Sequence, residues 1–349
     1  MTTENPKEVA TLVTSPTTSR RPEGPPSFAL AVKWALDNLV WFILVVILAL
    51  FSLAIPGFFQ IGIFFNIAYQ ATFVGILAVG LSFCIIAGQM DLSIESVLAF
   101  SAMLAAYLSG LSTAASGAQL PGIVSLVIVL AFGAMVGLCN GFFVVQLRIA
   151  AFIVTLAMYI LIRGLALILT KARSIFDLPP DMRIVANADL LGIPVLVLIL
   201  IVVYVFFHFV LTRTRFGRHV YLVGGNPTAP FRAGIKVNRL YYQVFILSGV
   251  LAAFAGWLLA ARTNGATPNL GFGMLFEVFA AVVIGGVSLA GGVGWLSGVF
   301  AGALLLSSIS TAINIIGLEP QYMQVIRGGL MLVAVLLDSL KRALRRFTE

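Results

Sequence analysis

Ten long apolar segments, separated by short polar connections, limit what this chain can fold into. We place them at about residues 38–55, 63–87, 93–110, 121–146, 150–170, 193–212, 241–262, 275–290, 293–316 and 322–340. A helix needs about 20 residues to cross the hydrocarbon core of a bilayer, and most of these segments reach that length. The sequence therefore predicts an all-α fold, a polytopic membrane helix bundle of about ten transmembrane helices. The segment 275–290 is short and precedes a glycine-rich stretch, so 275–316 forms either two full spans or a re-entrant pair.

The composition agrees with a membrane protein. Of the 349 residues, 60% are hydrophobic and only 10% are charged, whereas about 25% are charged in an ordinary soluble domain. The net charge of +8 does not indicate nucleic-acid binding, because the basic residues fall in predicted cytoplasmic loops and tails, where membrane orientation explains them. Cys84 and Cys139 lie in apolar runs, and His208 and His219 do not cluster with other ligand types. We therefore expect neither a disulfide nor a metal site.

One basic stretch, residues 213–240, fixes the predicted orientation. Its charged residues are all basic: Arg213, Arg215, Arg218, Arg232, Lys236 and Arg239. Short loops rich in Lys and Arg stay on the cytoplasmic side, so this stretch is expected to be a cytoplasmic coupling loop inside a transmembrane domain at 36–340. Residues 1–35 are predicted to form a disordered cytoplasmic tail, and 341–349 a basic cytoplasmic tail, which places both termini in the cytoplasm.

The second half of the basic stretch, residues 225–238, predicts a short helix on the cytoplasmic surface. Asn226 is a good N-cap, Pro227 suits the first helical position, and Gly234 would end the helix. Such a helix is a suitable attachment point for a soluble partner protein. From the residues alone, a solvated linker is the alternative.

A charge in lipid is costly and usually has a partner or a function, so five charged residues in the predicted spans need an explanation: Glu95, Arg163, Glu277, Arg327 and Asp338. Arg163, Glu277 and Arg327 all fall in the outer third of the predicted bundle. We expect Glu277 to pair with Arg163 or with Arg327. Direct contact with a transported solute is the alternative.

The motif GQMDLSIES at 88–96 interrupts two apolar runs. Asp91 or Ser93 is expected to cap the helix that follows. A polar break between helices can also line a translocation pathway. The candidate pathway residues are Gln89, Asp91, Ser93, Glu95 and, near the end of a later span, Asn314.

Small residues recur at every fourth position in two segments, at Gly133, Gly137 and Gly141 and at Gly294, Gly298 and Gly302. Each set lies along one helix face, which favours close helix packing, with a sliding gate as the alternative. The glycines of GGVSLAGGVG (285–294) lack the Gly-Lys-Ser/Thr of a phosphate loop and indicate a tight turn instead. The sequence also lacks a catalytic cluster, so we expect no enzyme.

Several long motifs, in the right order, resemble the permease subunits of bacterial ABC importers of the ribose, xylose and galactoside type. The resemblance covers roughly 40–340. It rests on AGQMDLSIESVLAF (87–100), GLCNGFFVVQLRIAAFIVTLAMYILIRGLALILT (137–170), FGRHVYLVGGNPTAPFRAGIKVNR (216–239), AAVVIGGVSLAGGVGWLSGVFAGALLLSSISTAINIIG (280–317) and MLVAVLLD (331–338).

The resemblance implies a pore-forming subunit, multi-pass in the bacterial inner membrane and surrounded by lipid, that translocates a monosaccharide. Two permease copies, identical or different, would dock two cytoplasmic ABC ATPases and a soluble substrate-binding protein. The ATP would be bound by the ATPase partner, so this chain would need no cofactor of its own. The resemblance assigns ATPase coupling to Gly224, Gly225, Asn226, Ala229, Arg232, Gly234 and Ile235.

The chain departs from the family pattern at several positions. The family usually has Gly where this chain has Glu95, and Gly–Ile where it has Gln89 and Met90. Pro230 replaces a usual Ala in the coupling segment. Because two departures fall on candidate pathway residues, the substrate is harder to infer. The alternatives are a permease for branched-chain amino acids or another small solute and, in a different class, an ion-coupled secondary transporter.

Overall fold

A computed structural model describes residues 38–226, 234–319, 322, 324–329, 331–333, 335, 336 and 339. The chain divides into two units, Met1–Asn38 and Leu39–Glu349, and only the second is described below. The predicted tails at 1–35 and 341–349 lie outside the described residues, as do Ala229, Arg232 and most of the helix expected within 225–238.

The described part is mostly helical, with only four strands of two residues each. Its helices are α2 (Leu39–Ala54), α3 (Ile61–Ile86), α4 (Ile94–Ser109), α5 (Gly122–Val145), α6 (Ala151–Thr170), α7 (Pro180–Asn187), α8 (Val195–Arg213), α9 (Arg215–Gly225), α11 (Val237–Thr263), α12 (Met274–Ile284) and α13 (Leu296–Ile316). Its strands form two antiparallel pairs, β1 (Ile175–Phe176) with β4 (Gly265–Ala266) and β2 (Asp189–Leu190) with β3 (Ile193–Pro194).

Six of these helices are long and apolar enough to cross a membrane: α3, α5, α6, α8, α11 and α13. α2, α4 and α12 are apolar but shorter, as is a helix at 324–333 of which only part is described. Each predicted apolar segment thus contains helical residues, and the prediction of a multi-helix membrane protein is confirmed.

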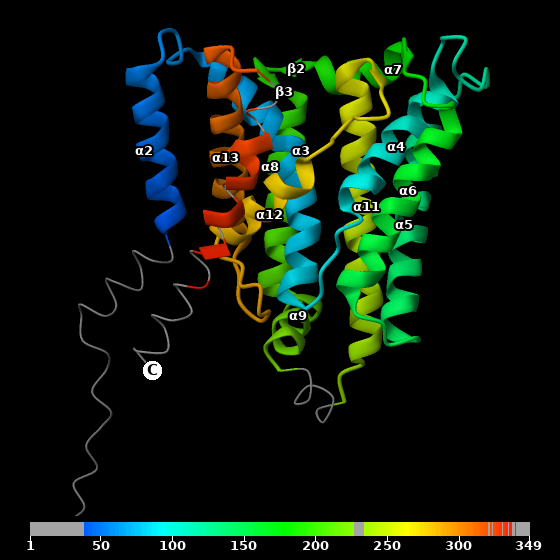
Figure 1. Ribbon diagram of the computed structural model, residues 1–349, viewed down its shortest axis with the longest axis vertical. Helices are drawn as coiled ribbons and strands as arrows, with labels where there is room; N and C mark the ends of the chain where they lie inside the picture. The colour runs from blue at the N-terminus through cyan, green and yellow to red at the C-terminus, as the bar shows by residue number, and fades with distance from the viewer. Residues whose placement is uncertain are drawn as a thin grey trace, which may run out of the picture. The chain divides into compact units, whose positions relative to one another are not determined.

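α4 and α12 are short because a non-helical segment precedes each of them, extended chain before α4 and a run of turns before α12. After α3 ends at Ile86, Gly88 turns the chain with a φ of +77°, and residues 87–93 run back into the bundle before α4 begins (Figure 1). The chain leaving α11 likewise runs into the interior before α12 begins, with Gly273 at a φ of +82°. Glycine is needed at both turns because a side chain strains this backbone conformation.

α3 and α11 form the centre of the bundle, and each is buried along most of its length. α5, α6 and α8 lie outside them, with large apolar side chains exposed on their outer faces, such as Ile160, Ile168 and Phe206. Apolar side chains facing outward, rather than polar ones, are what a helix surrounded by lipid requires.

The glycines of α5 allow close contact with α11. A methyl group on Gly137 would lie 2.6 Å from the Cα of Ile246, and one on Gly133 would lie 2.6 Å from the Cβ of Ala253. Helix association in lipid depends on such close packing, because lipid chains are as apolar as the helices. Gly298 and Gly302 make equally close contact with Gly285 and Ala281 at the α12 side.

Gly137→Ala should therefore lower the melting temperature of the detergent-solubilised protein by several degrees, because overpacking against backbone costs about 1–3 kcal/mol. Gly164→Ala in α6 is the matched control, since a methyl group added there would have no atom within 4 Å. The control should be as stable as the wild type, or slightly more so, because alanine favours helix by about 1 kcal/mol. Equal melting temperatures for both variants would show that the α5–α11 contact has little weight.

The basic stretch 213–240 is more helical than expected. Its first half is α9, which the side chain of Thr214 caps by accepting a hydrogen bond from the Gly217 amide at 3.2 Å. α9 buries Val220 and Val223 on one face and exposes its arginines. α11 then begins at Val237, four residues before the predicted start at 241. The sequence-based prediction missed α9 because it placed a helix only at 225–238 and treated the residues before it as a polar connection.

Candidate functional site

The first polar break, 87–93, is tied to its surroundings by a chain of hydrogen bonds. Asp91 Oδ1 accepts from the hydroxyl of Ser93 at 2.6 Å and from the Ser93 amide at 3.0 Å. The Ser93 hydroxyl in turn accepts from Asn140 Nδ2 of α5 at 3.0 Å. All three side chains are buried. The break is thus a fixed structure held against α5.

The expected capping of α4 is wrong in detail. Ser93 is the N-cap residue of α4, but no side-chain capping bond is present there. Asp91 instead accepts a hydrogen bond from the amide of Ser93, the residue before α4 begins, and this bond closes the turn. Asp91 therefore does not bind the free amides in the first turn of α4. Gln89, the other candidate in this break, is half-buried.

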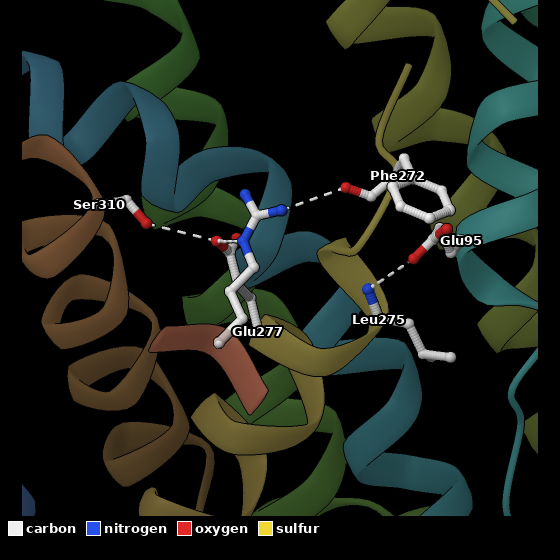
Figure 2. Close-up of polar contacts among 6 residues, drawn as sticks. Glu95, Phe272, Leu275, Glu277 and Ser310 are labelled. Atoms are coloured by element: carbon white, nitrogen blue, oxygen red, sulfur yellow. Dashed lines mark hydrogen bonds and ion pairs between the residues drawn. The ribbon is translucent and has the colours of Figure 1, made fainter. Parts of the chain in front are cut away.

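Glu95, in the first turn of α4, joins three helices. Its Oε2 accepts a hydrogen bond from the amide of Leu275, in the first turn of α12, at 2.9 Å, and its Oε1 accepts from the hydroxyl of Tyr159 of α6 at 3.1 Å. Figure 2 shows Glu95 reaching this turn of α12. A carboxylate stabilises a helix N-terminus because it binds a free amide and faces the positive end of the helix dipole.

Replacing Glu95 tests whether this acceptor or its charge is needed. Glu95→Ala should destabilise the protein by about 1 kcal/mol, the lower end of the range for a lost acceptor, because it leaves the half-buried Leu275 amide and Tyr159 hydroxyl without theirs. Glu95→Gln should remain close to wild type, since its amide oxygen still accepts from Leu275 and its NH₂ group donates to Tyr159, whose hydroxyl also accepts. Thermal unfolding in lipid nanodiscs measures both. Equal losses for the two variants would mean that the negative charge itself is required.

Glu277, also in the first turn of α12, forms an ion pair with Arg327 at 2.6 Å between Oε1 and Nε. The same oxygen accepts from the Ser310 hydroxyl of α13 at 3.3 Å, as Figure 2 shows. Arg327 also donates to the Phe272 carbonyl at 3.2 Å, which holds the segment before α12. Of the two arginines considered from the sequence, the structure brings Arg327 to Glu277.

Arg163 lies elsewhere. Its Nη2 is 3.4 Å from Asn269 Oδ1, and its guanidinium lies 5.7 Å from the centre of the Phe272 ring. Arg163 therefore contacts the run of turns that leads into α12. Phe272, in the same run, also contacts Arg327.

Two cavities lie beside the first turn of α12. One has a volume of about 500 Å³ and is lined almost wholly by apolar side chains, with Glu95 and Tyr159 at its polar end. The other has a volume of about 430 Å³ and includes Glu277 and Asn314 among several polar groups. Phe272 lines both cavities and so lies between them.

The C-terminal end of α9 contacts two breaks at once, the break at 87–93 and a second break, the glycine-rich connection 285–295 between α12 and α13. A methyl group on Gly224 would overlap the carbonyl oxygen of Ile86 and lie 2.7 Å from the amide of Gly292. The Gly292 amide itself donates to the Ile86 carbonyl at 2.8 Å. The glycine junction, meaning Gly88, Gly224, Gly291 and Gly292 with Ile86, therefore brings three distant segments into backbone contact.

Tyr221 reinforces this contact from the preceding turn of α9. Its hydroxyl donates to the carbonyl of Gly294 at 2.6 Å. Burial raises the pKa of this hydroxyl, so it stays protonated and able to donate. Of the predicted coupling residues, Gly224 lies in the glycine junction, and Gly225 lies next to it. Asn226 ends α9 in an extended conformation, and Gly234 and Ile235 lie just before α11.

Comparison with known proteins identifies the family. Residues 63–335 match the family described as the branched-chain amino acid transport system/permease component. The chain belongs to this permease family. The match begins within α3 and includes both breaks, α9, the glycine junction and both cavities.

Individual permeases support the same assignment. The chain is 35% identical to the ribose import permease protein of Escherichia coli K12 over 318 residues, 88% of this chain and 95% of that protein. It is 36% identical to an L-arabinose ABC transporter permease protein of Azospirillum brasilense, over 92% of this chain and 93% of that one. It is 33% identical to the D-allose transport system permease protein of E. coli K12, over 86% and 90%. No solved structure matches this permease.

Within this permease, several contacts were not foreseen from the sequence. Asn140 and Tyr221 each hold a break through one hydrogen bond, and Tyr159 holds Glu95 at the start of α4. Asn140 carried the clearest signal, since it is a polar residue in the apolar segment that also holds Gly133, Gly137 and Gly141. Tyr159 and Tyr221 resemble ordinary aromatic residues of an apolar segment and a polar connection, so only the fold reveals them.

Proposed function

We propose that this permease is the membrane-spanning subunit of an ATP-driven ABC importer that translocates a monosaccharide. One observation supports a monosaccharide as the substrate. Three relatives that align over at least 86% of this chain are named for ribose, L-arabinose and D-allose, all of them monosaccharides. The polar cavity beside Glu277 supports it, since it offers hydrogen-bonding groups inside an apolar bundle.

The chain crosses the bacterial inner membrane ten times in this proposal, with both termini in the cytoplasm. α4 with residues 87–93, and α12 with residues 267–273, each make one crossing as a non-helical segment followed by a helix that is shorter than a full span. Irregular backbone is tolerated at membrane depth where it is buried in protein or lines a cavity, and the second of these segments borders two cavities. α9 carries Arg215 and Arg218, and it lies at the same end of the unit as the start of α2 (Figure 1).

Transport requires a link between ATP hydrolysis and the pore, and α9 with the residues that follow it supplies that link. A cytoplasmic ABC ATPase docks on the segment from Gly224 to Ile235. A soluble binding protein delivers the sugar at the opposite face, and a second permease copy completes the pore. The glycine junction carries a displacement of α9 to both breaks because backbone touches backbone there, with no flexible side chain between.

Reconstitution tests the proposal. The permease is purified with the ATPase and binding protein encoded beside it and placed in proteoliposomes, and uptake of labelled D-ribose, L-arabinose, D-allose and L-leucine is measured with and without ATP. ATP-dependent uptake of at least one sugar is expected. ATP-dependent uptake of L-leucine alone would favour an amino-acid permease, as the family description suggests. Uptake driven by an ion gradient without ATP would favour a secondary transporter.

A further inference from the structure

The polar cavity is bounded by α3, α11, α12, α13 and the described part of the C-terminal segment. Its volume of about 430 Å³ falls in the usual range for small-molecule sites, roughly 300–1,000 Å³. The hydrogen-bonding groups at its wall come from Gln70, Glu277, Ser310, Asn314, Gln324 and Arg327. Phe73 and Phe272 add aromatic faces. Amides, a carboxylate and a guanidinium beside aromatic rings suit a ligand that has both hydroxyl groups and apolar C–H faces.

The charges at the cavity favour a neutral ligand. Glu277 and Arg327 neutralise each other through their 2.6 Å contact, so the wall carries no net charge from this pair. An amino acid would need the pair to open so that its ammonium and carboxylate could bind, and breaking a partly buried pair is costly. A neutral polyol leaves the pair intact and binds its remaining donors and acceptors.

We propose that this cavity holds one neutral monosaccharide during translocation. The proposal rests on the sugar importer proposed above and assigns the sugar to a place within one permease copy. The neighbouring apolar cavity does not suit a sugar, because its wall is nearly all hydrocarbon and would leave most sugar hydroxyls unpaired, which is unfavourable.

The test uses the reconstituted importer with two near-isosteric variants, Gln70→Met and Asn314→Leu. Neither residue belongs to the ion pair, and neither is fully buried. Gln146→Met, a partly exposed glutamine at the end of α5 and outside both cavities, is the matched control. The readout is moles of D-ribose, L-arabinose or D-allose imported per mole of ATP hydrolysed. Each cavity variant should lower this ratio by about three- to tenfold, the effect of one lost hydrogen bond, while ATP hydrolysis continues and the control stays at the wild-type ratio.

A second measurement does not depend on transport. Asn314→Cys is made in a Cys84→Ala, Cys139→Ala background and labelled with a water-soluble thiol reagent. The sugar that the wild type imports should slow this labelling, while L-leucine should not.

The outcomes separate the two proposals. The cavity assignment would be overturned by unchanged import ratios in both cavity variants, or by labelling that the imported sugar does not slow. The importer proposal would still hold in that case, provided that the wild type takes up a sugar. ATP-dependent uptake of L-leucine with no uptake of the three sugars by the wild type would contradict the sugar importer and the sugar cavity together.

Discussion

Replacing Gly224 by alanine should lower ATP-dependent sugar uptake in the reconstituted importer by more than tenfold. The added methyl would overlap the carbonyl of Ile86 and lie 2.7 Å from the amide of Gly292. These two atoms are hydrogen-bonded to each other, so the methyl must separate them or push α9 away from both. Alanine favours a helix by only about 1 kcal/mol, whereas overpacking costs about 1–3 kcal/mol even where side chains can adjust. Here the neighbours are backbone, so the unfavourable effect dominates.

Gly225→Ala is the matched control for this prediction. It is the next residue of the same helix, and its added methyl would meet only the Cα of Gly292, at the ordinary contact distance of 3.9 Å. We expect Gly225→Ala to retain most of the uptake. Thermal unfolding and ATPase assays of the assembled importer distinguish a folding defect from a loss of coupling. The role of the glycine junction would be refuted by a Gly224→Ala importer that transports as well as the Gly225→Ala importer.

Removing Arg327 should have the second large effect. Arg327→Met leaves Glu277 as a carboxylate at a side-chain exposure of only 10%, with the Ser310 hydroxyl but without its ion-pair partner. Removing one partner of a buried ion pair destabilises a protein by about 3–5 kcal/mol. Arg327 is partly exposed, with a side-chain exposure of 22%, so we expect the lower part of this range. Lower expression and a clearly lower unfolding midpoint in nanodiscs are the expected results.

The double variant Glu277→Gln, Arg327→Met separates the structural role of the pair from its role at the cavity. Without the carboxylate, no uncompensated charge remains, so most of the lost stability should return. Sugar imported per ATP should stay low, because the cavity has lost polar groups that the sugar would bind. A double variant no more stable than Arg327→Met would show that Glu277 and Arg327 act independently. Full recovery of transport would show that the pair serves folding alone.

The helical segments were predictable because one physical requirement determines them. A span must satisfy its backbone hydrogen bonds internally and present apolar side chains to lipid, so α3, α5, α6 and α13 appear in the sequence as apolar runs within a few residues of their true limits. The close packing along Gly133 and Gly137 was predictable for a similar reason, since small residues four positions apart share one helix face.

Part of the site was not predictable. The sequence marks 88–96 as polar, but it does not show that Glu95 meets the amide of Leu275, 180 positions away. Such contacts depend on how α4 and α12 are placed in the bundle, which local periodicity does not determine. α9 was missed for a different reason. Its buried face is short, consisting of Gly217, Val220 and Val223, and arginines lie between these residues in the sequence or next to them.

The glycine junction has a genetic consequence. Gly88, Gly224 and Gly291 are far apart in the gene but share one small volume in the protein, where no side chain fits at Gly224 or Gly291 without moving backbone. A side chain added at Gly224 or Gly291 is therefore tolerated only if the neighbouring backbone shifts with it. Second-site suppressors of a substitution at Gly224 or Gly291 should therefore map to the other stretches that meet at the glycine junction.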